Sequence, residues 1–239
     1  MQGRVFITGD KHGSMRMLFG ISEKKLMGEN DVLIITGDTG YVQDGDYPHK
    51  IRTIERLFPG TLCFIDGNHD NHEILSSLPI SLWNGGRVHM LGERVCHLMR
   101  GELYSIHGSN FFTLGGARTV ANFIEGEEGV DWWPGEEPTA EELRFAKGQF
   151  MSNIGNIDYI VTHEAPLSAR EGIPRLKRVD ADYILPGFLQ ELLEYSAQDS
   201  RLKKWYFGHM HVDLQLGPVL RAIYNNLVEA GSEKTIRWF

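Results

Sequence analysis

Apolar runs and amphipathic stretches alternate along the first third of the chain. Residues 4–8, 31–36 and 61–66 are short, apolar and rich in β-formers, and a glycine follows each run, which is typical of buried strands. The stretches between them repeat apolar residues at helical spacing, and they predict helices over 14–27, 47–58 and 72–78. This strand–helix alternation predicts a parallel sheet that is covered on both faces.

The pattern changes in the middle of the chain, where short strands follow one another without helices. Glycine-containing turns separate predicted strands at 87–91, 95–99, 103–107 and 111–114, which indicates a meander in an antiparallel or mixed part of the sheet. Further strands are predicted at 157–162, 204–207, 218–224 and 234–238, and helices at 139–150, capped by Thr139, and at 185–195.

Two segments lack such periodicity. Residues 115–138 form an irregular acidic insertion that contains Trp132 and Trp133, and residues 166–182 form a polar, basic loop. We expect both segments to be rims of a pocket, because loops carry much of the variation in binding sites. The two tryptophans suit either a stacking lid for a base or a packing anchor, and packing is favoured.

Composition narrows the class of protein. A chain of 239 residues with 41% hydrophobic residues fits a single α/β domain over 1–239. The net charge of −8 disfavours nucleic acid as a partner unless a local basic patch exists. We expect a cytoplasmic protein without a membrane partner, because no apolar run approaches about 18 residues and the chain starts directly in a strand. Of the two cysteines, Cys63 lies in an apolar run and is expected to be a buried thiol.

Five short polar motifs carry the candidate chemistry, and each follows a predicted strand. They are Gly9-Asp10-Lys11-His12-Gly13, Gly37-Asp38, Gly67-Asn68-His69-Asp70, Thr162-His163-Glu164 and Gly208-His209-Met210-His211. Ligand sites of open α/β sheets lie beyond the carboxyl ends of the strands, so we expect these motifs to converge. Taken singly, each motif is equally a strand-end cap or turn.

The residue types in these motifs are metal ligands. Asp10 and His12 are two residues apart, as are His209 and His211, so each pair points to one side if the chain is extended. Carboxylate, imidazole and amide ligands suit Mn²⁺, Fe, Zn²⁺ or Co²⁺ better than Ca²⁺. The ordered set predicts two divalent ions about 3.5–4 Å apart that share a bridging carboxylate.

The ordered motifs resemble the D-x-H, G-D, G-N-H-[DE], H and G-H-x-H blocks of the calcineurin-like metallophosphoesterase superfamily. The resemblance spans residues 9–211 and implies a two-sheet mixed β-sandwich flanked by helices, the metallo-dependent phosphatase fold. It implies one ion on Asp10, His12 and His211, another on Asn68, His163 and His209, and Asp38 bridging them. By the same resemblance, metal-bound hydroxide attacks phosphorus and His69 is the general acid. Mn²⁺ is the favoured ion, with Fe, Zn²⁺, Co²⁺ and Mg²⁺ as alternatives.

The second block departs from that of the protein Ser/Thr phosphatases in this superfamily, which read G-D-x-V-D-R-G. Here the block reads Gly37-Asp38-Thr39-Gly40-Tyr41-Val42, with Tyr41 in place of the second aspartate and no arginine after it. The tail of the chain is more similar to that of the small bacterial and phage-type members of the superfamily. His69 excludes a branch that has cysteine at that position.

Several charged residues near the motifs have open roles. Arg118 and Asp70 are candidates for substrate binding, although Arg118 suits a plain surface arginine equally well. Asp70 can also orient His69 or cap the following helix, with capping favoured. Lys11 is expected to point away from the ligands into solvent, and His107 is expected to lie outside the site. A basic cluster in the loop can receive a phosphorylated substrate, although a solvated charge run is favoured; it consists of Arg170, Arg175, Lys177 and Arg178.

The sequence thus predicts a metal-dependent phosphoesterase acting on a phosphorylated substrate, with a phosphomonoesterase favoured. A phosphodiesterase or nuclease that acts on nucleotides or short nucleic acid is the first alternative. A metal-bound protein that binds a partner without turnover is the second.

Overall fold

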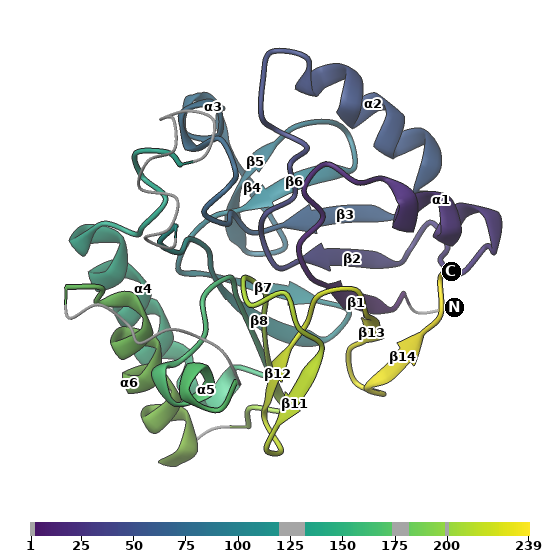
Figure 1. Cartoon of the computed structure of the whole chain (residues 1–239). Helices are drawn as coiled ribbons and strands as arrows, with labels where there is room; N and C mark the ends of the chain where they lie inside the picture. Colours follow the sequence, from purple (N-terminus) through teal and green to yellow (C-terminus); the bar gives the residue numbers. More distant parts are fainter. Residues whose placement is uncertain (1–2, 120–131, 174–181, 199–200) are drawn as a thin grey trace.

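The computed structural model describes residues 3–119, 132–173, 182–198 and 201–239. Within these residues the strands form two sheets (Figure 1). The first sheet has the order β14-β13-β1-β2-β3-β6-β5-β4. Its strands are β1 (Val5–Thr8), β2 (Val32–Ile35), β3 (Thr61–Phe64), β4 (Ile80–Trp83), β5 (Gly86–Met90), β6 (Val95–Leu98), β13 (Leu227–Glu229) and β14 (Lys234–Ile236).

The second sheet has the order β11-β12-β10-β9-β8-β7. Its strands are β7 (Glu102–Ile106), β8 (Ser109–Leu114), β9 (Tyr159–Thr162), β10 (Lys204–Phe207), β11 (Leu214–Leu216) and β12 (Leu220–Ala222). Both sheets are mixed, because parallel central strands are joined by antiparallel strands at the edges.

Helices cover the outer faces of the two sheets. They are α1 (Arg16–Glu23), α2 (Tyr47–Leu57), α3 (His72–Ser77), α4 (Ala140–Asn153), α5 (Leu167–Glu171) and α6 (Leu185–Gln198), and a 3₁₀ turn over Ile154–Asn156 follows α4. In Figure 1, α1 and α2 lie on the side of the first sheet and α4, α5 and α6 on the side of the second. Thr139 caps α4 in a capping box with Glu142, as the sequence predicts.

Alternation along the strands builds the core between these layers. In β1, Val5 and Ile7 join the cluster between the two sheets, while Phe6 joins the cluster under α1 and α2. In β9 and β10 the same alternation sends Val161 inward, whereas Trp205 packs beneath α4 and α6. The result is a helix–sheet–sheet–helix sandwich, and the fold class expected from the resemblance is confirmed.

The structure corrects the predicted meander. β5 and β6 belong to the first sheet and β7 and β8 to the second, because the chain crosses between the sheets at Met99–Gly101. The sequence did not predict β4, β11 and β13, which are only three or four residues long. In β4 the apolar Ile80 and Leu82 are exposed, so the apolar residues at alternate positions do not form a buried face of this strand.

Two further expectations change. The helix predicted over 14–27 ends at Glu23, and Lys25 has a left-handed backbone (φ 50°), which is incompatible with a continuing helix. The segment predicted as a loop over 166–182 contains α5. Residues 120–131 and 174–181, with Arg175, Lys177 and Arg178, lie outside the described residues, so their expected roles remain predictions.

Cys63 is a buried thiol as predicted. It faces the equally buried Cys96 across the β3–β6 pair, with 3.4 Å between the sulfur atoms. Among the described helices, none is both long enough and apolar enough to cross a membrane.

Candidate metal centre

The five motifs meet at one edge of the sandwich. β1, β2 and β3 are adjacent parallel strands of the first sheet, and β9 and β10 are adjacent parallel strands of the second. Each motif begins within three residues of the end of its strand, so the carboxyl ends of these five strands share one edge. The predicted convergence of residues as distant as Asp10 and His211 is thus explained by the sheet order.

One set of candidate metal ligands is partly open to solvent, and we call it the outer ligand group: Asp10, His12 and His211. With Asp38, their ligand atoms all lie within 4.8 Å of one another. The Nε2 atoms of His12 and His211 are 3.0 Å apart, and His211 Nε2 lies 3.0 Å from Asp10 Oδ2. The imidazoles are 39% and 48% exposed, while Asp10 is buried.

A second set of candidate metal ligands is largely buried, with His209 9% exposed, and we call it the inner ligand group: Asn68, His163 and His209. Ligand atoms of Asp38, His163 and His209 also lie within 4.8 Å of one another. His163 Nε2 lies 3.1 Å from the amide oxygen of Asn68. His163 has no exposed side-chain surface, and Asn68 is 1% exposed.

Asp38 belongs to both sets. Its Oδ2 lies 3.9 Å from His12 Nε2 and 3.5 Å from His163 Nε2, while its Oδ1 accepts a hydrogen bond of 2.8 Å from the backbone N–H of His69. Burial raises the pKa of Asp38, but His163 and His69 outweigh this and keep it well below its usual range. One oxygen of a buried, ionised carboxylate therefore faces both groups.

These residues fit a pair of divalent cations. Asp10 Oδ2 is buried and accepts no hydrogen bond from any described residue, although His211 Nε2 is close to it. A buried carboxylate oxygen without a donor is costly, and a cation bound between these side chains would satisfy it. The donors are oxygens and ring nitrogens, the mixture that suits first-row transition metals.

The backbone around the ligands is strained. His12, Asp38, His209 and His211 all have a left-handed backbone, with φ between 45° and 59°. Non-glycine residues adopt this region at a cost, and such strain concentrates at functional sites. The chain is therefore not extended at residues 10–12 and 209–211, which was the condition for each pair to point to one side, but the turns still bring both pairs to the site.

Two motif glycines are required by close packing against ligands. At Gly37 (φ 99°) a Cβ atom would lie 2.3 Å from His163 Nδ1. At Gly208 it would lie 2.5 Å from Asp10 Oδ1. A larger residue at either position would displace a ligand side chain.

The orientation of His163 is fixed by its other nitrogen. Nδ1 donates a hydrogen bond of 2.6 Å to the backbone oxygen of Thr36, so Nε2 faces Asp38 and Asn68. A ring held in this way presents one nitrogen to a metal. Burial lowers the pKa of His163, but the carboxylates of Asp38 and Asp10 outweigh it and raise the pKa to about 10. The same negative field favours a cation beside the ring.

Comparison of the sequence with models of protein families identifies the family of this chain. The family model described as calcineurin-like phosphoesterase matches residues 3–213, nearly nine-tenths of the chain. The chain belongs to the calcineurin-like phosphoesterase family. A search of the curated proteins finds no match to this sequence. As a family member the protein is a metal-dependent phosphoesterase that uses divalent metal ions, in agreement with the resemblance.

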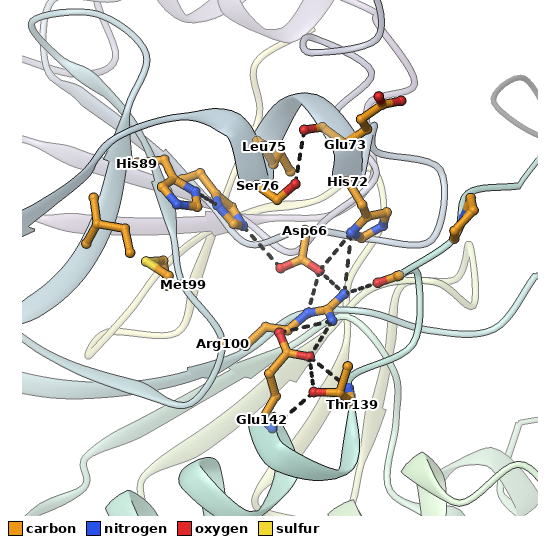
Figure 2. A pocket seen from close by; sticks show the side chains of 14 residues that line it. Asp66, His72, Glu73, Leu75, Ser76, His89, Met99, Arg100, Thr139 and Glu142 are labelled. Atoms are coloured by element: carbon orange, nitrogen blue, oxygen red, sulfur yellow. Dashed lines mark hydrogen bonds and ion pairs between the residues drawn. The ribbon is translucent and has the colours of Figure 1, made fainter.

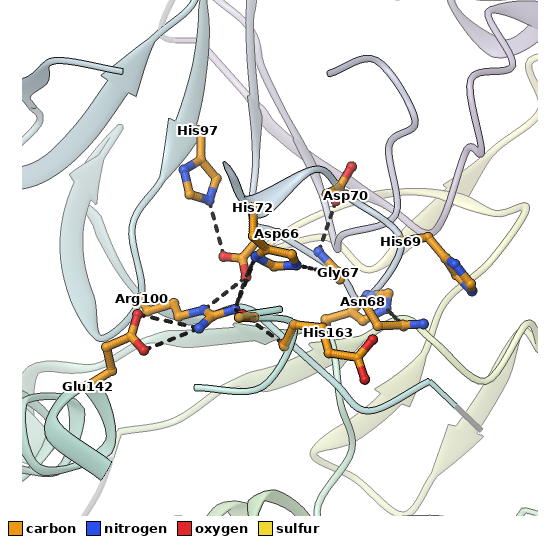
Figure 3. Close-up of polar contacts among 12 residues, drawn as sticks. Asp66, Gly67, Asn68, His69, Asp70, His72, His97, Arg100, Glu142 and His163 are labelled. Atoms are coloured by element: carbon orange, nitrogen blue, oxygen red, sulfur yellow. Dashed lines mark hydrogen bonds and ion pairs between the residues drawn. The ribbon is translucent and has the colours of Figure 1, made fainter. Parts of the chain in front are cut away.

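In this calcineurin-like phosphoesterase His69 stands at the rim of the ligand groups. Its ring centre lies 5.7 Å from that of His12, and the residue is half-buried. Figure 3 shows its imidazole directed away from the polar cluster around Asp66. Its backbone N–H is fixed by Asp38, so His69 is held next to the residue that both ligand groups share.

Asp70 does not cap α3. Asn71 caps that helix by accepting a hydrogen bond from the backbone N–H of Ile74. Asp70 is fully buried, and its oxygens accept hydrogen bonds from Thr39, Gly40 and the backbone N–H of Gly67. It joins the loops after β2 and β3, and it has no exposed surface for a substrate.

Arg118 and Lys11 are both engaged by the protein. Arg118 forms ion pairs with Glu137 (2.6 Å) and Asp182 (3.1 Å). Lys11 is buried, which contradicts the expectation that it is solvated. That expectation assumed an extended chain, whereas His12 has a left-handed backbone. Lys11 Nζ donates to the backbone oxygen of Tyr224 at 3.1 Å, and burial lowers its pKa to about 8.

His107 lies outside the centre as expected, since its Nε2 contacts the backbone oxygen of Asn30 at 2.8 Å. Trp133 is buried, in accord with the packing interpretation.

Sequence reasoning assigned no role to Glu164, although it stands next to His163. Glu164 is fully buried, and its Oε2 lies 3.8 Å from His209 Nε2 and 2.7 Å from the hydroxyl of Tyr183. The guanidinium of Arg170 contacts the same oxygen at 2.6 Å, so this arginine is not part of a solvated charge run. In the sequence, the one indication that Glu164 contributes to the site is its position inside the Thr162-His163-Glu164 motif.

Proposed function

We propose that this protein is a phosphomonoesterase with a two-ion centre, in which Asp10, His12 and His211 hold one ion, Asn68, His163 and His209 hold the other, and Asp38 bridges them. His69 is the general acid. The observation that carries the proposal is the position of Asp38 Oδ2 between His12 and His163, with His69 held beside it.

Each component has a task in ester hydrolysis. Two divalent ions in these groups, with Mn²⁺ favoured, would supply charge that activates a water molecule and polarises the phosphoryl group. His69 protonates the leaving oxygen and helps to hold the phosphoryl group, a role suited to an imidazole near neutral pH. Asp38 fixes the backbone of His69 and so couples the acid to the ligand groups.

Charge favours small monoesters over long nucleic acid. The net charge of −8 repels a polyanion. The charge of Arg118 is balanced by Glu137 and Asp182, so this residue adds little attraction for a phosphate chain. A phosphodiesterase acting on nucleotides is the second candidate, since a diester reacts at the same centre.

The test compares p-nitrophenyl phosphate with bis-p-nitrophenyl phosphate on metal-stripped protein resupplied with Mn²⁺. We expect the monoester to be preferred. Preference for the diester would overturn the monoesterase assignment and favour the second candidate.

His69→Ala tests the proposed acid. We expect turnover to fall about 10²–10⁴-fold with an unchanged metal content, because the imidazole donates a proton and is not a ligand. His49→Ala, which removes an exposed imidazole from α2, is the matched control and should be neutral. Unchanged turnover in His69→Ala would show that the role of His69 is wrong.

A further inference from the structure

The amide of Asn68 has a partner on each side. Its Oδ1 lies 3.1 Å from His163 Nε2, inside the inner ligand group. Its Nδ2 donates a hydrogen bond of 3.1 Å to the hydroxyl of Thr119. Only the oxygen of an amide can ligate a cation, so the side chain is useful in one of its two orientations.

Thr119 is in turn held by Glu136. The Thr119 hydroxyl contacts Glu136 Oε2 at 2.6 Å, and the backbone N–H of Thr119 donates to Glu136 Oε1 at 2.9 Å. Both oxygens of the carboxylate are thus directed at one residue. Thr119 follows β8, and Glu136 precedes α4, so the contact joins segments that are separate from the ligand motifs.

The hydrogen bonds that connect Asn68, Thr119 and Glu136 can run in only one direction from donor to acceptor. An ionised carboxylate only accepts hydrogen bonds, so the Thr119 hydroxyl must donate to Glu136. The hydroxyl oxygen is then left to accept from Asn68 Nδ2, and Asn68 Oδ1 must face His163. The carboxylate at the far end therefore selects the orientation of the amide.

Arg100 holds both the segment that contains Glu136 and the turn that contains Asn68. Its Nη2 donates to the backbone oxygens of Gly135 (2.8 Å) and Glu136 (3.2 Å), and its guanidinium pairs with Asp66 at 2.7 Å. Asp66 stands two residues before Asn68. Figure 3 shows Arg100 pairing with both Asp66 and Glu142. The backbone of Glu136 and the turn of Asn68 are thus tied to one buried side chain.

The anchor lies in a wall of an open pocket of about 460 Å³ (Figure 2). His97 Nε2 contacts Asp66 at 3.1 Å, and His72 Nε2 contacts the backbone oxygen of Gly67 at 2.9 Å. These contacts hold the turn that leads to Asn68, and they do not involve Thr119.

We infer that Thr119 and Glu136 are positioning residues that fix the amide of Asn68 for the ion of the inner ligand group. The inference rests on the proposed two-ion centre. Partners of this kind, which contact the ligand and not the ion, typically change metal affinity about 10–100-fold.

The test measures metal binding itself. Metal-stripped wild type and Thr119→Val are titrated with Mn²⁺ by calorimetry, and bound metal is counted by elemental analysis. Valine keeps the shape of threonine and removes the hydroxyl. We expect one of the two ions to bind about 10–100-fold more weakly while the other is unchanged. In turnover assays kcat should fall more than KM rises.

Two variants separate positioning from packing. Thr119→Ser keeps the hydroxyl and should retain both ions. Glu136→Gln keeps the size of the side chain, but glutamine can donate as well as accept a hydrogen bond. The Thr119 hydroxyl is then no longer forced to donate to residue 136, so this variant should also weaken the binding of one ion. Thr53→Val on the exposed face of α2, where the hydroxyl contacts the backbone oxygen of His49, is the matched control.

The outcomes distinguish the two proposals. If wild type binds two ions and Thr119→Val and Glu136→Gln bind both as tightly, the positioning role is wrong and the proposed function stands. If folded wild type binds fewer than two ions, the two-ion centre fails and the inference falls with it. Loss in Thr119→Ser equal to that in Thr119→Val would also overturn the role of the hydroxyl.

Discussion

The outer and inner ligand groups differ in how firmly their side chains are held. In the outer group the imidazoles of His12 and His211 are 39% and 48% exposed, and the His211 ring stacks on Tyr224. In the inner group His163 is fully buried and hydrogen-bonded to Thr36, and Asn68 is hydrogen-bonded to Thr119. One half of the centre thus borders solvent, and the other is fixed by contacts behind its ligands.

In the proposed two-ion centre this difference has consequences for metal binding. A charge is stabilised more strongly by carboxylates in a buried site than near water, and fixed ligands lose less freedom when they bind. We therefore expect the inner ion to bind more tightly and to exchange more slowly than the outer ion. Substitutions that act on both groups, on one group or only on a supporting residue should rank in that order.

Asp38→Asn should have the largest effect, because it removes the one negative charge that both groups share. The amide oxygen can still accept the hydrogen bond from the His69 N–H, so the local turn should persist. Breaking a buried ion pair costs about 3–5 kcal/mol, which corresponds to about 10²–10⁴-fold in affinity. Metal content and turnover should both fall.

The control for Asp38→Asn is Asp44→Asn, which neutralises an exposed carboxylate six residues away. It should change neither metal content nor turnover. Loss of a single ion from Asp38→Asn, with the other bound as in wild type, would contradict the bridging position of Asp38.

His163→Ala and His211→Ala should separate the two groups. His163→Ala removes an inner ligand and leaves the Thr36 oxygen buried without its donor, so it should cost about 1–3 kcal/mol of stability besides weakening the inner ion. His211→Ala removes a half-exposed ligand, so the outer ion should weaken with little change in thermal unfolding. Calorimetric titration and thermal unfolding of both variants check this.

Similar results for His163→Ala and His211→Ala would contradict the proposed difference between the inner and outer ligand groups. Equal loss of stability in His163→Ala and His211→Ala would show that burial does not distinguish the groups. Faster release of the inner ion than of the outer ion by a chelator from wild type would reverse the expected order.

The ligand motifs could be predicted from the sequence because their signals are local. A buried apolar strand that ends in glycine and a polar motif is visible without the fold, and the order of the strands supplies the convergence. Asp10, Asp38, Asn68 and His163 lie where parallel strand ends meet, as expected from that reasoning.

The supporting residues could not be predicted, because their roles depend on contacts distant in sequence. Thr119 contacts Asn68 across 51 positions, and Arg100 contacts Asp66 across 34. Lys11 was expected in solvent on the assumption of an extended chain, but the chain is not extended at His12, and Lys11 is buried. Asp70 was expected to cap α3, but the helix starts one residue later than that requires.

The smallest expected effect concerns the support of the outer group. The rings of His211 and Tyr224 are stacked, with centres 4.7 Å apart and an angle of 16° between their planes. Such a contact is worth about 0.5–1.5 kcal/mol. Tyr224→Leu removes the ring but keeps the backbone oxygen that accepts from Lys11 Nζ, and it should weaken the outer ion about 2–10-fold. Tyr224→Phe keeps the stack and should match wild type. Because this ring pair belongs to the outer group, a change in the affinity of the inner ion would show that the two groups are not supported separately.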